Sequence, residues 1–119
     1  WQRLAGKEPA QPYYFYAADG KPFAFAGLWE FLRSPDGEDL RSCTILTTRA
    51  NGVVAPVHER MPVMLTGTQM EGWLSAGPAD RLMSMLQPFP DEALHSRPVS
   101  RLVNSPDRDG PELILPSAA

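Results

Sequence analysis

The sequence has little cysteine, little basic charge and no long apolar run. Cys43 is the only cysteine among 119 residues, which excludes an intrachain disulfide and a thiolate metal cluster. Its two histidines lie far apart and lack the spacing of a zinc site, so we expect no metal and no cofactor. The net charge of −3 argues against a surface coated in basic residues, although it allows a local basic groove. No run approaches the roughly 20 apolar residues of a membrane span, so we expect no membrane contact.

Proline is abundant. The chain has 13 prolines, which interrupt it often, so we expect any helices to be short. Its 119 residues are enough for one domain with one core, and a hydrophobic content of 43% is typical of a globular chain. Most segments with a clear pattern indicate strands. The predicted fold is therefore α+β, a strand-dominated curved sheet or partly open β-barrel with short helices.

The first half of the chain indicates three strands. Residues 13–17 are aromatic and predict a strand, and Asp19-Gly20 is typical of a hairpin turn. Residues 22–31 would be the returning strand, largely buried on both faces, and residues 42–48 a third, apolar strand. Cys43 falls inside that strand, where we expect it to be a small buried hydrophobe.

The second half mixes turns, helices and strands. Asn51-Gly52 favours a turn, followed by a short helical turn over 53–57 and a fourth strand over 61–65. Thr66 and Gln69 have the spacing of a capping box at the start of a helix. The remaining expectations are an apolar helix face made by Met70, Trp73 and Leu74, a second short helix from Pro78 with a stripe of Leu82, Met85 and Leu86, and late strands over 98–103 and 112–115.

His58 is the residue that most suggests chemistry. It stands between two apolar runs and is followed by Glu59 and Arg60, which are candidates to hold an imidazole or an anion. One interpretation is a half-buried histidine hydrogen-bonded to backbone. The other is a general acid or base, since an ordinary imidazole titrates near neutral pH. A nucleophilic pair of Cys43 with His58 is a third hypothesis, and His95 reads as a surface residue in a polar loop.

Several blocks of the chain together resemble one family. They run in the order QPYYFY, DGKPFAFAGLWE, CTILTTRAN, HERMPVML, WL, PVSRLVN and ELI. In this order and spacing they are similar to the SRAP family, the SOS response-associated peptidase domain. The resemblance covers essentially all of residues 1–119, but only the C-terminal part of a single SRAP domain.

The resemblance implies a covalent reaction with DNA. In this family a cysteine at the mature N-terminus links to abasic sites in single-stranded DNA, assisted by an asparagine, a glutamate and a histidine. His58 matches that catalytic histidine, and Arg60, Thr47 and Trp1 match residues implied to lie against DNA. The cysteine, asparagine and glutamate would fall before Trp1, so we expect Cys43 not to be the nucleophile.

The implied function is abasic-site sensing by DNA–protein crosslink formation, with associated autoproteolytic peptidase activity, in the SOS response. The implied partners are abasic single-stranded DNA and either the protein's own N-terminal half or a second copy, in the bacterial cytoplasm and on the nucleoid when bound to DNA. Whether this chain is itself an enzyme stays open, because the family's nucleophile is not among its residues. The alternatives are an inactive half-domain or a non-enzymatic module that binds a partner.

Overall fold

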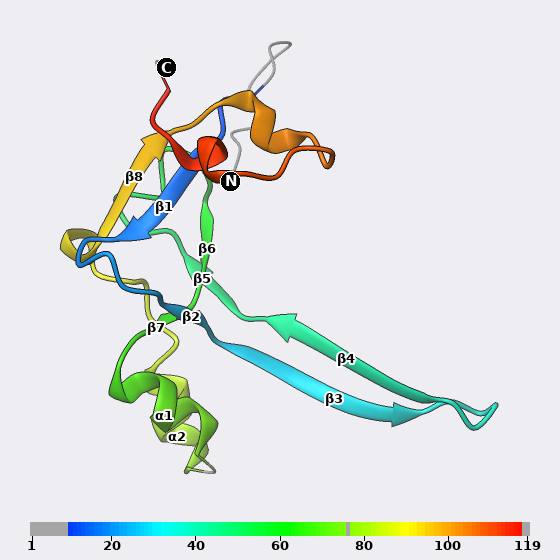
Figure 1. Ribbon diagram of the computed structural model, residues 1–119. Helices are drawn as coiled ribbons and strands as arrows, with labels where there is room; N and C mark the ends of the chain where they lie inside the picture. The colour runs from blue at the N-terminus through cyan, green and yellow to red at the C-terminus, as the bar shows by residue number, and fades with distance from the viewer. Residues whose placement is uncertain (1–9, 76, 118–119) are drawn as a thin grey trace.

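The computed structural model describes residues 10–75 and 77–117, and these form a mixed α+β fold. The α+β prediction is confirmed. The strands pair in four antiparallel two-stranded ladders rather than in one continuous sheet (Figure 1). These are β1 (Tyr13–Ala17) with β8 (Leu94–Pro98), β2 (Ala24–Phe25) with β7 (Met64–Leu65), β3 (Gly27–Arg33) with β4 (Asp39–Ile45), and β5 (Thr47–Arg49) with β6 (Arg60–Pro62). Over the described residues these ladders do not close into a barrel.

Three of the ladders meet at a backbone junction. The Ala26 N–H donates to the Val63 carbonyl at 2.8 Å, the Val63 N–H to the Leu46 carbonyl at 2.9 Å, and the Leu46 N–H to the Ala26 carbonyl at 2.9 Å. Each of these residues separates two strands, so each chain segment changes its pairing partner there. The predicted strand over 61–65 is consequently split at Val63 into β6 and β7.

The junction divides the buried side chains into two groups. One core contains Val54, Met61, Met64, Phe89 and Leu94, and the other contains Ala26, Val63 and Leu65. The segment 61–65 contributes to both, which explains why it is apolar throughout. Met61 and Val63 have no exposed surface at all.

Two short helices cover the second core. They are α1 (Thr68–Leu74) and α2 (Ala79–Ser84), with three single-turn 3-10 segments later in the chain, η1 (Asp91–Ala93), η2 (Arg101–Asn104) and η3 (Pro111–Ile114). Met70 and Trp73 pack on this core as expected, and the Trp73 indole N–H donates to the Gly27 carbonyl at 3.1 Å. Leu74 does not share that face, because 86% of it is exposed.

The predicted capping box is only half formed. The Thr66 N–H donates to the Gln69 side chain at 3.4 Å, but no side chain caps α1, whose N-cap is Gly67 at φ 51°. The helix therefore begins slightly later than the box implies. The second helix follows Pro78 as expected, with that proline at the N-cap rather than at the first helical position.

The predicted hairpin between residues 13–17 and 22–31 is wrong. The turn forms, with Gly20 at φ 70°, but β1 pairs with β8 and not with the segment that follows. Two-residue hairpins of the type that Asp-Gly favours need positive φ at both central residues, and Asp19 does not have it. Pro22 also lacks the N–H that a ladder needs.

Both predicted late strands are wrong as well. Beyond Pro98 the chain makes one isolated bridge at Val99 and then enters η2, whose first turn is capped by the Ser100 hydroxyl. Residues 112–114 belong to η3, which starts at Pro111 after Gly110, and Leu115 is its C-cap. A serine before a turn and a proline at a first helical position are helix-start signals, and they prevail over the apolar residues behind them. The true late strand is β8, and it contains His95.

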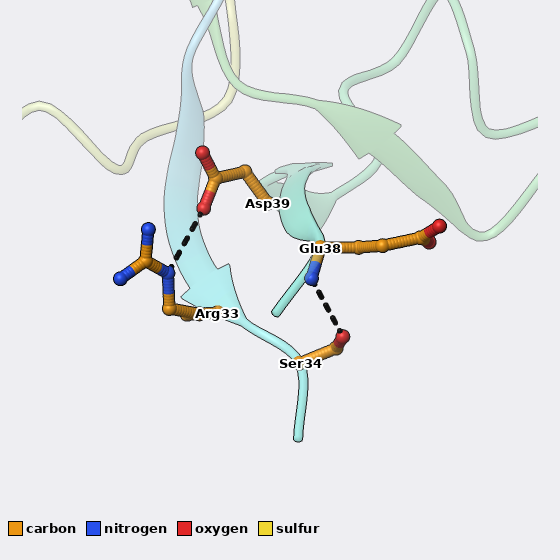
Figure 2. Close-up of polar contacts among 4 residues, drawn as sticks. All are labelled: Arg33, Ser34, Glu38 and Asp39. Carbon is orange, nitrogen blue, oxygen red and sulfur yellow. Dashed lines mark hydrogen bonds and ion pairs between the residues drawn. The ribbon is translucent and has the colours of Figure 1, made fainter. Parts of the chain in front are cut away.

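The β3–β4 hairpin is an exposed arm. Figure 1 shows it extending away from the other elements. Figure 2 shows its tip, where the Glu38 N–H donates to the Ser34 hydroxyl at 3.2 Å and Arg33 pairs with Asp39 at 3.4 Å. The arm carries many large apolar side chains that are at least half exposed, namely Leu28, Trp29, Phe31, Leu32, Leu40 and Ile45. The expectation that residues 22–31 are buried on both faces is therefore wrong, and so is the expected burial of Cys43.

Candidate nucleic-acid interface and acid–base residue

A buried asparagine builds the turn that leads to His58. Asn51 is 7% exposed, and its side-chain amide donates to the Phe89 carbonyl at 2.8 Å. Its side-chain oxygen accepts from the Val54 N–H at 2.9 Å. The His58 N–H then donates to the Val54 carbonyl at 2.9 Å, which completes one helical turn. The predicted helical turn over 53–57 is thus present, and the side chain of Asn51 anchors it to the first core.

Gly52 is fixed in this turn by a second contact. Its N–H donates to the Asp91 carboxylate at 2.9 Å, and a Cβ at this position would collide with the same carboxylate. The Asn51-Gly52 pair therefore supplies an anchored side chain and a close backbone approach. From the sequence the pair indicates only a turn.

The His58 ring is exposed and held by backbone. Its Nδ1 lies 2.9 Å from the carbonyl oxygen of Arg60 and 3.0 Å from the backbone nitrogen of Arg60. A neutral ring can accept the Arg60 N–H at Nδ1, whereas a protonated ring can donate from Nδ1 to the Arg60 carbonyl. The same ring position therefore has a backbone partner in either protonation state. The expected backbone hydrogen bonding is present, but the ring is not half-buried.

Arg60 is held in place by Thr47. Its Nη2 donates to the Thr47 carbonyl at 2.8 Å and to the Thr47 hydroxyl at 2.9 Å, and its Nε lies 3.3 Å from that hydroxyl. The two residues come from adjacent strands, β6 and β5. The sequence-predicted residues Thr47, His58 and Arg60 are thus brought together, and all three are exposed.

Thr47, His58 and Arg60 form what we call the polar edge, and strand alternation separates it from the core. Met61, next to Arg60 in β6, has no exposed surface and belongs to the first core. Neighbouring residues in a strand point to opposite faces, so burial of Met61 directs Arg60 outward. The buried Met61 of HERMP thereby orients the arginine that precedes it.

A hollow is lined in part by β6. Its volume is about 210 Å³, and Pro62, which stands opposite Thr47, forms part of its wall. Aromatic side chains from β1, from β2 and from the residue just before β2 supply most of the rest, namely Tyr13, Tyr14, Phe15, Phe23 and Phe25. Pro62 therefore connects this apolar concavity to the strand that carries Arg60.

The other candidates lie elsewhere. Trp1 falls outside the described residues. Cys43 is exposed in the arm, opposite Trp29, whereas the Nδ1 of His58 contacts Arg60. His95 is exposed as expected, but it lies on β8 and makes an edge contact with Tyr16, with ring centroids 5.6 Å apart.

The described residues, 10–75 and 77–117, lack two features. No cluster of three or more histidine, cysteine, aspartate or glutamate side chains is arranged there to hold a metal ion. No helix in that part of the chain is long and apolar enough to cross a membrane.

Comparison with known proteins shows the family. Residues 1–106 match the model of the SOS response associated peptidase (SRAP) family, and the chain belongs to this family. It is 40% identical over 116 residues to the abasic site processing protein YoqW of Bacillus subtilis, covering 96% of this chain and 51% of that protein. It is 31% identical over 138 residues to the abasic site processing protein HMCES of Gallus gallus, covering 98% of this chain and 40% of that protein.

A solved structure supports the fold. A crystal structure of a protein from Bacteroides thetaiotaomicron superposes with a TM-score of 0.84 at 26% identity, covering 98% of this chain and 52% of that one. The chain spans about half the length, or less, of the curated relatives named above.

Proposed function

We propose that this chain supplies the acid–base residue and part of the DNA-binding surface of a protein that crosslinks to abasic sites in single-stranded DNA. The observation that carries this proposal is the exposed edge on which His58, Arg60 and Thr47 meet. This edge belongs to a chain that is 40% identical to a protein named for abasic-site processing. The associated autoproteolytic peptidase activity, the SOS response and the bacterial cytoplasm, with nucleoid association on DNA, belong to the same proposal.

The proposed chemistry needs a proton carrier. An abasic deoxyribose is mostly a closed ring, and only its open form has an aldehyde. An amine and a thiol of one cysteine then add to the aldehyde carbon, which loses its oxygen as water and becomes part of a thiazolidine ring. Ring opening moves a proton at the sugar oxygen. We propose that the imidazole of His58, whose Nδ1 lies beside the Arg60 backbone, moves this proton.

Arg60 has the geometry of a phosphate contact. A guanidinium presents a planar fork of donors that suits phosphate oxygens. Two Thr47 oxygens already hold one side of the Arg60 guanidinium, so its direction is fixed before DNA arrives. We propose that this arginine positions the backbone next to the abasic sugar, with Trp1 against the bases.

Arg60→Ala should weaken single-stranded DNA binding without regard to sequence. Loss of one phosphate contact lowers the log–log salt slope by about 0.7, which corresponds to roughly a five-fold loss of affinity at 0.1 M salt. Titration of the intact protein at several salt concentrations measures both. Arg60→Lys keeps the charge and should retain most of the slope. An unchanged slope in Arg60→Ala would contradict the phosphate contact.

We propose further that residues 1–119 are the C-terminal part of a single SRAP domain and that the β3–β4 arm packs on the rest of it or on a second copy. An exposed two-stranded ladder with a 75%-exposed Trp29 leaves much apolar surface in water. Two strands alone are also marginal in stability.

The isolated chain should therefore self-associate or be poorly soluble. Sedimentation of the 119-residue chain, with and without a Trp29→Ser and Leu32→Ser double substitution, tests this. We expect the substitutions to shift the distribution toward monomer. A monodisperse, cooperatively melting monomer of the unsubstituted chain would contradict the proposal.

The arm also favours a second candidate function. Exposed apolar patches often mark protein-binding surfaces. A non-enzymatic module would use the arm to bind a partner and would make no use of His58. Substitution of His58 or Arg60 should disable the DNA-crosslinking function but not the partner-binding function, because only the former depends on the polar edge.

A further inference from the structure

Two arginines stand directly opposite each other beside the candidate site. Arg49 ends β5 and Arg60 begins β6, and the register pairs these two residues. Directly opposite residues of an antiparallel pair point to the same face, with Cβ atoms about 4.5–5.5 Å apart. Thr47, which contacts Arg60, is also on this face, because it lies two positions before Arg49 on the same strand.

The pair is not explained by charge pairing in the described part of the chain. Over residues 10–75 and 77–117 the single ion pair joins Arg33 to Asp39, at the tip of the arm. Both Arg49 and Arg60 are exposed. Like charges directly opposite each other destabilise a ladder, so this arrangement does not contribute to the stability of the β5–β6 pair. The local excess of positive charge also contrasts with the net charge of −3.

We propose that Arg49 is a second phosphate-binding residue, which with Arg60 holds one backbone phosphate of single-stranded DNA between two guanidinium groups. This inference rests on the proposed function, and it adds a residue outside the HERMP block. A phosphate between the two groups neutralises their repulsion. The Thr47 contacts fix Arg60 on one side, and Arg49 approaches the same phosphate from the neighbouring strand.

Arg49→Gln in the intact protein tests this assignment by affinity. We expect single-stranded DNA binding to weaken about three- to five-fold at 0.1 M salt and the salt slope to fall by up to about 0.7. Arg81→Gln is the matched control, because Arg81 is also exposed but lies on α2, away from β5 and β6 in Figure 1. It should bind as the unsubstituted protein does.

Thermal stability separates binding from a structural role. Removing one of two opposed charges should raise the melting temperature of DNA-free Arg49→Gln by about 1–4 °C. A residue that merely supports the fold would lower it. A variant that binds DNA less well and is at least as stable therefore supports the assignment, and one that loses both overturns it.

An uncharged linkage placed in the DNA backbone identifies which phosphate Arg49 and Arg60 bind. Oligonucleotides that carry one methylphosphonate at successive positions remove one backbone charge at a time. At one position the neutral linkage should weaken binding by the unsubstituted protein more than Arg49→Gln does, and it should weaken binding by Arg49→Gln by a smaller factor, because that variant has only the Arg60 contact left to lose. If Arg49→Gln binds normally while Arg60→Ala is weakened, this inference fails and the proposed function stands. If neither variant is weakened, the proposed function fails with it.

Discussion

His58→Ala should slow covalent capture of an abasic site by about 100-fold, the low end of what general acid–base catalysis contributes, because the sugar also opens unaided. Its affinity for unmodified single-stranded DNA should stay within about two-fold, since the substitution leaves the charge of Arg60 in place. The rate is read from single-turnover crosslinking of the intact protein on a denaturing gel, and the affinity from a separate titration. The crosslinking rate therefore reports on the His58 imidazole, and the affinity reports on the Arg60 guanidinium of the same polar edge.

His95→Ala is the matched control for this substitution. It removes the only other imidazole, which lies on β8 against Tyr16, and it should change neither quantity. A purely structural His58 would behave differently, because loss of its contacts to Arg60 backbone would loosen the turn and lower stability. Small, equal losses of rate and affinity in His58→Ala would end the catalytic assignment.

The 119-residue chain by itself should form no covalent adduct with abasic single-stranded DNA. The crosslink needs an amine and a thiol on neighbouring carbons of one residue, and the side chain of Cys43 supplies only a thiol. A thiol alone gives a reversible addition product that does not survive denaturation. Incubation followed by a denaturing gel measures this directly.

A Cys43→Ser variant is the control that tests whether Cys43 acts as the nucleophile. In the intact protein it should crosslink at the unsubstituted rate, since Cys43 lies in the arm opposite Trp29. A shifted band from the isolated chain that disappears in Cys43→Ser would mean that Cys43 is the nucleophile. That outcome would overturn the expectation that the reactive cysteine precedes Trp1.

The grouping of Thr47, His58 and Arg60 was more predictable from the sequence than the strand pairing. The HERMP block already places a histidine two positions before an arginine that begins a strand, and alternation with the buried Met61 directs that arginine away from the core. What the sequence did not indicate is the Arg49–Arg60 register. Cross-strand pairing depends on which segments meet, and local pattern does not encode that.

Two of the errors in the fold, the hairpin and the buried strand, have a common cause. Asp19-Gly20 forms its turn, yet β1 finds its partner nearly 80 residues later, in β8. The apolar run of the arm indicates burial, yet nothing in the described chain covers Trp29, Phe31 or Leu32. In the first case a distant strand took the place of the expected neighbour. In the second case the described chain contains no partner for the apolar side chains. Local sequence pattern determines neither outcome.

The most direct test of the account separates ring opening from attack on the aldehyde. The substrate is single-stranded DNA with an acyclic aldehyde at one position, which cannot close to a sugar ring. If His58 opens the ring, His58→Ala should be about 100-fold slow on a natural abasic site but within about three-fold of the unsubstituted protein on the acyclic aldehyde. An equal loss on both substrates would contradict the account, because His58 would then act on a step other than ring opening.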